Sequence, residues 1–264
     1  MECDGELVEL QGGLVPRSWV AAIQMIVQNL DPRPVVVLRG EAGTGKDLVA
    51  RLLHAAAGRA PHSFVKVRCA LPPDRLAVQL FGHERDGGEK SRRRRLGAVQ
   101  FAHRGTLYLD HVEALPASLH AAVLPLLLGQ PVRRAGGPIP IAPDVAVVLS
   151  TSAPCLATPR EDVWRAEPTL RVLDMELPPL RARRQHVESL AEFFLRRFND
   201  WYDRAVSLSA KTRAWLRDYD WPGNVAELES VVRGLVTADD PAEGPRHGGR
   251  PLESPPSSVS RRSA

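Results

Sequence analysis

Stretches of continuous apolar residues alternate along this chain with stretches of helical periodicity. The apolar stretches are typical of buried parallel strands, and they span residues 34–38, 63–67, 106–109, 145–150 and 172–177. The helical stretches lie within residues 19–30, 46–57, 71–81 and 118–128. Strands that alternate with helices predict an α/β fold, in which helices cover both faces of a parallel sheet.

After Pro178 and Pro179 the periodicity becomes helical only, which predicts a small all-helical subdomain. Its helices are expected at residues 185–200, 210–219 and 225–236. The end of the chain is rich in Pro, Gly, Ser and Arg and has little to bury, which predicts disorder. The four expected parts are an N-terminal lead, an α/β subdomain, a helical subdomain and a disordered tail, at residues 1–14, 15–180, 181–238 and 239–264.

The segment GEAGTGKD, between the first expected strand and the helix that follows it, has the spacing of a phosphate-binding loop. Its glycines let backbone N–H groups converge on a phosphate, and the N-terminus of the next helix adds partial positive charge. The residues expected to bind nucleotide are Gly40, Glu41, Ala42, Gly43, Thr44, Gly45, Lys46 and Asp47. The alternative, a glycine-rich turn with an exposed lysine, explains neither the spacing nor the flanking strand and helix.

The segment RGTLYLDHVEAL predicts a short buried strand that ends on an acid, Asp110. In a nucleotide-hydrolysing protein that acid holds a magnesium ion. The alternative is that Asp110 caps the next segment, which its position directly after TLYL disfavours. The next residue should be a carboxylate that activates water, but it is His111. The question is therefore whether this chain has kept the nucleotide and lost the reaction.

Composition is that of a soluble globular protein and offers no membrane span. The 264 residues are 44% hydrophobic and 25% charged, and proline interrupts the longest apolar runs. The N-terminal segment MECDGELVEL lacks the basic and apolar regions of a signal peptide. Three widely spaced cysteines suit reduced thiols, so we expect a cytoplasmic protein.

The net charge of +4 does not by itself indicate nucleic-acid binding. Only four of the 35 basic residues are lysine, so the basic excess is an arginine-rich bias of the whole chain. One dense cluster lies at residues 92–95, after Lys90. It could contact phosphates, but a solvated loop is the favoured interpretation of such a block.

Five segments follow one another in a characteristic order: GEAGTGKDLVARLLH, LFGHE, GTLYLDHVEALP, LPPLRARR and YDWPGNVAELESVV. In these segments the chain resembles the central AAA+ domain of sigma-54-dependent transcriptional activators, the bacterial enhancer-binding proteins. The resemblance runs from about residue 15 to residue 236, and the family's acidic residue after the P-loop lysine accounts for Asp47. It implies a P-loop NTPase fold, with a five-stranded parallel sheet between helices and a helical lid.

The resemblance implies a ring-forming ATPase, in which ATP lies between subunits and hydrolysis drives a loop that remodels sigma-54 RNA polymerase. ATP or ADP would bind at residues 40–47 with Mg²⁺ at Asp110, and an arginine of a neighbouring subunit would reach the γ-phosphate. Arg160 in PREDV matches the first such arginine. The second stays open between Thr169 and the nearby Arg165.

Several positions that the family uses for hydrolysis have changed. His111 stands where the family has its glutamate, and Arg68 where it has the asparagine that holds that glutamate. Ser152 stands at a sensor position usually occupied by asparagine, and Ala226 replaces the lid arginine that senses nucleotide. A histidine could accept a proton as general base, but it lacks fixed negative charge. An ordinary loop histidine is therefore the favoured interpretation of His111.

The loop by which the family contacts sigma-54 has also changed. Where the family has Gly-Ala-Phe-Thr-Gly-Ala, this chain has DGGEKS at residues 86–91. A loop without an aromatic residue has little apolar surface to place against a partner, so we do not expect productive contact with sigma-54. Nor do we expect a receiver domain before residue 15, or a DNA-binding helix-turn-helix after residue 236.

Three functions are compatible with these residues. The first is an active ATPase that remodels sigma-54 RNA polymerase. The second is an ATP-binding but hydrolysis-poor regulator of transcription, a pseudo-ATPase that acts on full-length AAA+ relatives or joins their ring. The third is a nucleotide-independent protein-interaction scaffold. The intact P-loop disfavours the third function, while His111, Arg68 and Ala226 disfavour the first. We favour the second.

Overall fold

The computed structural model describes residues 6–28, 34–59, 61–83, 95–134, 140–152, 164, 167–238, 246–247 and 250–251. These residues form two compact units. One contains the described residues of Ser18–Glu41 and Lys46–Leu177, and we name it the α/β unit. The other contains those of Met1–Arg17, Ala42–Gly45 and Pro178–Ala264, and we name it the lid unit.

The α/β unit is built on a five-stranded sheet whose strand order is β11-β3-β10-β7-β4. Its strands are β3 (Val35–Arg39), β4 (Phe64–Arg68), β7 (Thr106–Asp110), β10 (Ala146–Thr151) and β11 (Val172–Glu176). All neighbouring pairs in this sheet are parallel, as the sequence predicts. Because parallel strands end at one edge of a sheet, the loop after β3 and the acid at the end of β7 lie at the same edge.

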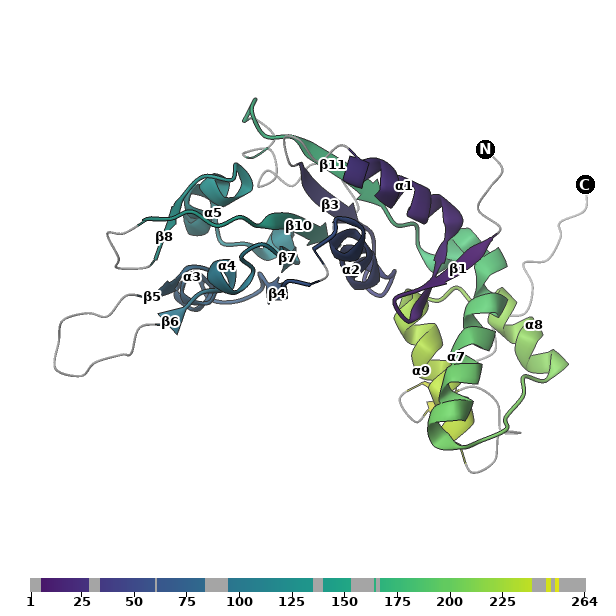
Figure 1. The fold of residues 1–264 in the computed structure, drawn as a ribbon. Coiled ribbons are helices and arrows are strands. Elements are labelled where there is room, and N and C mark those ends of the chain that lie inside the picture. The colour runs from purple at the N-terminus through teal and green to yellow at the C-terminus, as the bar shows by residue number, and fades with distance from the viewer. Residues whose placement is uncertain are drawn as a thin grey trace, which may run out of the picture. The chain divides into compact units, whose positions relative to one another are not determined.

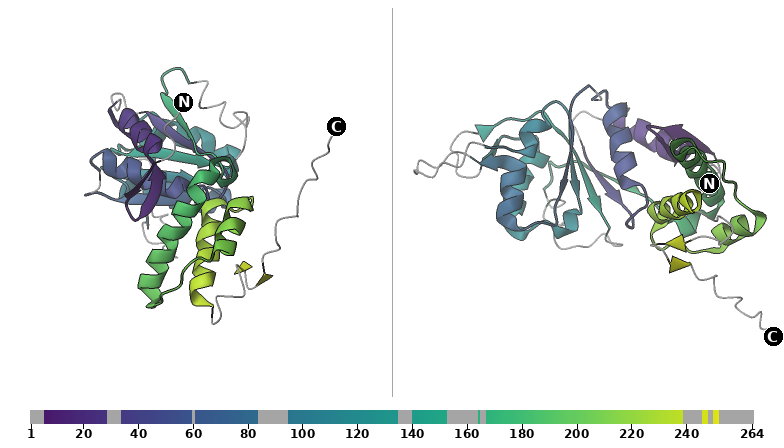
Figure 2. Two further views of the ribbon diagram at one scale, coloured as in Figure 1. Left: turned by 90° about the vertical axis from the view of Figure 1, so that its right-hand side faces the viewer. Right: turned by 90° about the horizontal axis from the view of Figure 1, so that it is seen from below.

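Helices cover both faces of this sheet, with α2 on one face and α3, α4 and α5 on the other (Figures 1 and 2). The helices of this unit are α1 (Arg17–Gln28), α2 (Lys46–Ala56), α3 (Pro73–Phe81), α4 (Ala98–Phe101) and α5 (His120–Leu127). The 3₁₀ turns η1 (Val112–Ala114) and η2 (Ala117–Leu119) follow β7. Two small antiparallel pairs are β5 (Gly82–His83) with β6 (Arg95–Leu96), and β8 (Val132–Arg133) with β9 (Pro140–Ile141).

Burial on both faces explains why the strand sequences show no polar alternation. Every residue of β3 is buried. Val35 and Val37 share one hydrophobic core with Leu107 and Leu109 of β7 and with apolar residues of α3, α4 and α5. Since successive side chains of a strand point to opposite faces, the intervening Val36 faces the other helical layer, where it is also buried.

The lid unit consists of helices and a β-hairpin. Its elements are β1 (Leu7–Leu10), β2 (Gly13–Pro16), η3 (Leu180–His186), α7 (Val187–Tyr202), α8 (Ala210–Asp218), α9 (Asn224–Thr237), β12 (Arg246–His247) and β13 (Arg250–Pro251). The three α-helices match the predicted helical subdomain and share a second hydrophobic core. The β1–β2 hairpin was not predicted, and its Leu7 and Leu14 pack against this core. No helix within the described ranges is long and apolar enough to cross a membrane.

Candidate functional site

The P-loop has the backbone conformation that its glycines permit. The φ angles of Gly40, Gly43 and Gly45 are 152°, 77° and 106°, values that residues with a side chain rarely adopt. Lys46 is the first residue of α2, and its Nζ donates hydrogen bonds to the carbonyl oxygens of Gly40 (2.6 Å) and Glu41 (2.8 Å). The ammonium group therefore lies back over the loop that precedes its helix, where a phosphate could replace these carbonyl partners.

Lys46 is a buried cation, with 8% of its surface exposed. Burial lowers the pKa of Lys46, and the charges of Asp110 and Glu113 only partly offset this effect. The pKa shift shows that the lysine lies within electrostatic range of both carboxylates. An anion that displaced the carbonyl oxygens would restore a charged partner to this ammonium group.

Within the lid unit, the tip of the P-loop is held by residues around the start of α9. The carbonyl oxygen of Gly43 accepts hydrogen bonds from the backbone N–H groups of Val225 (3.0 Å) and Ala226 (3.3 Å). Ala226 is the residue that the sequence resemblance leads us to expect at the position of the family's lid arginine. A Cβ atom on Gly43 would lie 2.3 Å from the carbonyl oxygen of Gly223, so this close approach requires glycine.

Two further side chains of the lid unit bind carbonyl groups of the P-loop. Asn224 is fully buried, and its Nδ2 donates to the carbonyl oxygen of Ala42 (2.9 Å) while its Oδ1 accepts from the N–H of Leu180 (2.7 Å). Arg183 donates from Nη2 to the carbonyl oxygen of Thr44 (2.9 Å). The loop that would hold the phosphates is therefore ordered by the lid unit's own polar residues.

Asp110, the acid at the end of β7, is held by donors from two other strands. Ser150 of β10 donates to its Oδ1 (2.5 Å), and Lys66 of β4 forms an ion pair with its Oδ2 (3.2 Å). Burial raises the pKa of Asp110, but the Ser150 hydrogen bond and the Lys66 charge outweigh it, so the pKa lies below its ordinary value. Asp110 is therefore ionised at neutral pH.

His111 follows Asp110 in the left-handed conformation, with a φ of 57°. Its ring Nδ1 lies 3.2 Å from Oε1 of Glu113. The same Glu113 oxygen accepts a hydrogen bond from the backbone N–H of Ser152 (3.2 Å). The carboxylate of Glu113 thus contacts both the imidazole of His111 and the end of β10.

Arg68 is the last residue of β4, and in the parallel register it lies opposite Asp110. This register places Arg68 beside the strand end that carries His111. The sequence resemblance leads us to expect a family asparagine at the first position and a family glutamate at the second. The structure brings Arg68 and His111 to one edge of the sheet.

A magnesium ion at this edge would depend on Asp110, since carboxylate oxygens are its preferred protein ligands and it is usually bound by one or two carboxylates plus phosphates. Both oxygens of Asp110 already have protein partners, Ser150 and Lys66. Asp110 is ionised, and the side-chain oxygen Oγ of Ser152 is buried without a hydrogen-bond partner among the described residues. The described residues contain no cluster of three or more His, Cys, Asp and Glu. Asp110 with bound phosphates would therefore have to form the site.

The remaining predicted site residues fall outside this edge. Arg160, Arg165 and the DGGEKS loop at residues 86–91 lie outside the described residues. Thr169 is described, and its Oγ1 donates to Oε1 of Glu167 (2.6 Å) just before β11 begins. Thr169 precedes the start of β11, whereas the P-loop follows the end of the parallel strand β3. Thr169 therefore lies at the opposite end of the strands from the P-loop.

Sequence reasoning missed two charged residues of the site, Lys66 and Glu113. Lys66 interrupts the apolar strand FVKVR, and a charge within an expected buried strand was the available signal. Glu113 lies three residues after Asp110, where only the 3₁₀ turn η1 brings its carboxylate back to the strand end. That turn follows no periodic pattern that the sequence displays.

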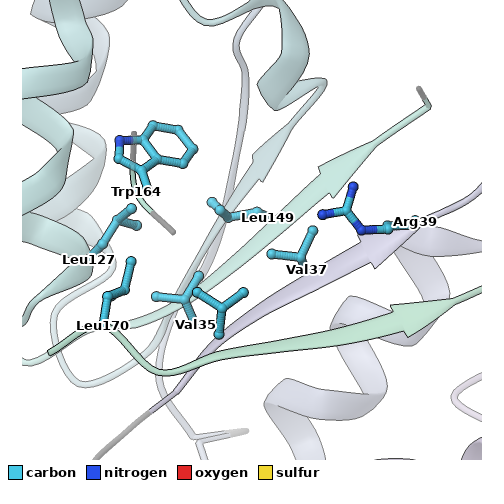
Figure 3. Close-up of a pocket in the computed structure, with 8 residues that line it drawn as sticks. Val35, Val37, Arg39, Leu127, Leu149, Trp164 and Leu170 are labelled. Carbon is cyan, nitrogen blue, oxygen red and sulfur yellow. The ribbon is translucent and has the colours of Figure 1, made fainter. Parts of the chain in front are cut away.

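Two pockets in the described part of the α/β unit are not lined by Lys46, Lys66 or Asp110. Figure 3 shows a small pocket in which Trp164, Leu127 and Leu170 face Val35 and Val37. Its volume of 20 Å³ suffices for about one water molecule, so it is a packing defect of the core. A wider groove of 730 Å³ lies at the starts of β3 and β10, the end of the strands opposite the P-loop.

Two family models match consecutive parts of the chain. Residues 16–177 match the model described as a sigma-54 interaction domain, and residues 181–243 match an AAA+ ATPase lid domain. The first match covers the described α/β unit almost completely, and the second begins in η3 and includes α7, α8 and α9.

Similar curated proteins are transcription regulators. The Nif-specific regulatory protein of Bradyrhizobium diazoefficiens is 36% identical over 220 residues, which cover 82% of this chain and 38% of that protein. Regulatory protein AtoC of Escherichia coli is 35% identical over 205 residues, which cover 76% of this chain and 44% of that protein. This chain therefore spans less than half the length of either relative.

Similar solved structures include NtrX from Brucella abortus in complex with ADP and in complex with ATP. Both have a TM-score of 0.71 and 30% sequence identity to this chain. The match to the ADP complex covers 86% of this chain and 51% of the NtrX chain. The match to the ATP complex covers 92% of this chain and 56% of the NtrX chain.

Proposed function

Because this chain belongs to the sigma-54 interaction domain family of AAA+ proteins, we propose that it is a nucleotide-binding regulator of sigma-54-dependent transcription that hydrolyses ATP poorly. The observation that carries the proposal is an intact P-loop beside a strand end whose catalytic carboxylate has become His111. Its substrate class is the adenine nucleotides, ATP and ADP.

The P-loop supports nucleotide binding. Its three positive φ angles and the buried ammonium group of Lys46 provide N–H groups and charge for a polyphosphate. The solved NtrX structures, at 30% identity, hold ADP or ATP. A magnesium ion supplies positive charge against phosphate oxygens when it is bound, and at Asp110 it would have to displace Lys66.

The strand ends support weak hydrolysis. A water molecule that attacks a phosphate needs a base beside it, and a fixed carboxylate serves this purpose in the family. Here the imidazole of His111 is bound to Glu113, and Glu113 is itself bound to the backbone of Ser152. Arg68 adds positive charge at the same edge, where the family has a neutral amide.

We propose that this chain acts either by joining rings of full-length AAA+ relatives or by contacting sigma-54 RNA polymerase. A nucleotide-bound but hydrolysis-poor subunit would occupy a place in a ring and lower its turnover. The trans arginine of the proposal is Arg160. The sigma-54 partner and the cytoplasmic setting that we expect are part of this proposal, because this chain spans less than half the length of these curated relatives.

Isothermal titration calorimetry with ATP and with ADP tests nucleotide binding. We expect a Kd on the order of micromolar for the wild-type chain. Lys46→Ala should abolish binding, since this ammonium group is the main phosphate-directed charge of the P-loop. Lys211→Ala, which removes an exposed lysine of α8, is the matched control and should bind like the wild type. No heat with either nucleotide on a folded wild-type sample would contradict the proposal.

A further inference from the structure

Lys66 lies between the two carboxylates nearest the P-loop. Its Nζ is 2.7 Å from Oδ1 of Asp47, at the start of α2, and 3.2 Å from Oδ2 of Asp110, at the end of β7. The ammonium group also lies 5.3 Å from the ring centroid of Tyr108, within the range of a cation–π contact. Three contacts, one from α2 and two from β7, therefore fix one cation at this point.

The carboxylate oxygens around Lys66 are all engaged by protein donors. Oδ2 of Asp47 lies 3.2 Å from Nε of Arg51, while Oδ1 faces Lys66. Oδ1 of Asp110 accepts the short hydrogen bond from Ser150, while Oδ2 faces Lys66. A divalent cation that approached these oxygens directly would have to displace an existing partner, and it would have to lose water, which Mg²⁺ does reluctantly.

Among Lys46, Lys66, Asp47 and Asp110 the positive and negative charges are equal in number, and Arg51 adds a further positive charge beside Asp47. Lys46 and Lys66 carry positive charge, and Asp47 and Asp110 carry negative charge. Both carboxylates lie within ion-pair distance of the Lys66 ammonium group.

We propose that Lys66 is a resident cation that competes with Mg²⁺ for Asp47 and Asp110 and makes nucleotide binding by this chain largely independent of divalent cations. This inference rests on the proposed nucleotide binding at the P-loop. Lys66 neutralises the two carboxylates that would otherwise repel the phosphates. Magnesium is then no longer needed to offset that repulsion, and the ammonium group already fills the place where it would act.

The test compares ADP affinity in excess Mg²⁺ with ADP affinity in excess EDTA, by calorimetry on the full chain. For the wild type we expect the two Kd values to agree within about threefold. For Lys66→Met, which keeps the length of the side chain but removes its charge, we expect removal of Mg²⁺ to weaken ADP binding by about tenfold or more. Without the Lys66 charge, Asp47 and Asp110 repel the phosphates more strongly unless a divalent cation offsets their charge, although Arg51 and Ser150 still contact them.

Two matched variants separate charge from packing. Lys66→Arg keeps the charge and should bind ADP with little dependence on Mg²⁺, as the wild type does. Lys211→Met makes the same chemical change at an exposed residue of α8 and should also behave like the wild type. Far-ultraviolet circular dichroism checks that each variant is folded.

A second measurement needs no nucleotide. Mn²⁺, a paramagnetic substitute for Mg²⁺, is titrated into the chain and its bound fraction is followed by electron paramagnetic resonance. The wild type and Lys66→Arg should bind Mn²⁺ at least about tenfold more weakly than Lys66→Met. Equal Mn²⁺ affinity in all three proteins would overturn the competition between Lys66 and the metal.

The outcomes distinguish the two proposals. If the wild type binds ADP but depends on Mg²⁺ as strongly as Lys66→Met does, the role of Lys66 is overturned and nucleotide binding stands. If no protein binds ADP in either buffer, nucleotide binding fails and the role of Lys66 fails with it.

Discussion

The P-loop and the ends of β7 and β10 lie at one edge of the same sheet, yet they have diverged to different degrees. The P-loop keeps its glycines, its lysine and the family's acidic residue. The strand ends keep Asp110, and in our proposal His111, Arg68 and Ser152 stand at positions that the family uses for hydrolysis. If the proposal holds, a fold can retain the geometry for holding phosphate while it loses the groups that activate water.

The difference has a physical basis in what each function requires. Phosphate binding depends mainly on backbone N–H groups, helix orientation and one ammonium group, and the fold supplies most of these. Activation of water depends on one carboxylate at one position, held by one neighbour. A single substitution removes the second function, whereas the first persists as long as the loop conformation does.

The largest predicted effect concerns Cys69, whose backbone N–H donates to the carbonyl oxygen of Asp110 (2.8 Å). Burial, with smaller contributions from Asp110 and Glu113, raises the pKa of Cys69 to about 12. The thiolate is the reactive form, so at about pH 8 alkylation should be at least about a thousandfold slower than for an unfolded thiol.

Iodoacetamide labelling followed by mass spectrometry measures this rate, on a chain in which Cys3 and Cys155 are replaced by serine. The rate should rise about tenfold per pH unit, because each step exposes tenfold more thiolate. Rapid labelling of Cys69 in the native protein would mean that the strand ends are open to solvent. The described contacts of Asp110 and its neighbours would then not represent the protein in solution.

The next effect is a gain of hydrolysis. In the double variant His111→Glu with Arg68→Asn, the carboxylate and its amide partner return to the strand ends. We expect ATP turnover to rise by about a hundredfold, at the lower end of what a positioned general base contributes. The control, His111→Gln with Arg68→Asn, has nearly the same shape but no base. A phosphate-release assay in which both double variants gave the same rate would show that the carboxylate is not what is missing.

The smallest effect concerns the hydrogen bonds that Asn224 makes to Ala42 of the P-loop and to Leu180. Asn224→Ala leaves the N–H of Leu180 and the carbonyl oxygen of Ala42 without partners, which should cost about 1–3 kcal/mol of unfolding free energy. Urea denaturation measures this loss, and ADP should protect Asn224→Ala less than the wild type.

Asn199→Ala is the matched control for Asn224→Ala. Asn199 makes two hydrogen bonds to the backbone of Val206 and none to the P-loop. Its loss should lower stability without changing the protection by ADP. If ADP protected both variants equally, the contacts of Asn224 with the P-loop would matter only for folding.

The sequence predicted the fold well because the fold rests on periodic patterns. Five apolar runs became five parallel strands, and the helical stretches after Pro178 and Pro179 became α7, α8 and α9. The β1–β2 hairpin was missed because its four-residue strands are too short to show a period, and its partner, the helical core of the lid unit, lies far away in sequence.

The candidate site was predicted only where a motif marked it. The P-loop and Asp110 follow strands with known spacing, so their positions could be derived. Lys66 and Glu113 act through contacts between strands and turns that no spacing encodes. Asn224 and Arg183 likewise reach the P-loop from residues about 140 to 180 positions away in the chain.

The most direct test of the central claim is a measurement of ADP binding and of ATP turnover on one preparation of the wild-type chain. Calorimetry and a phosphate-release assay on that sample should give a Kd on the order of micromolar together with negligible turnover. Turnover on the order of one per second, typical of an active enzyme, would contradict the account, and so would the absence of binding.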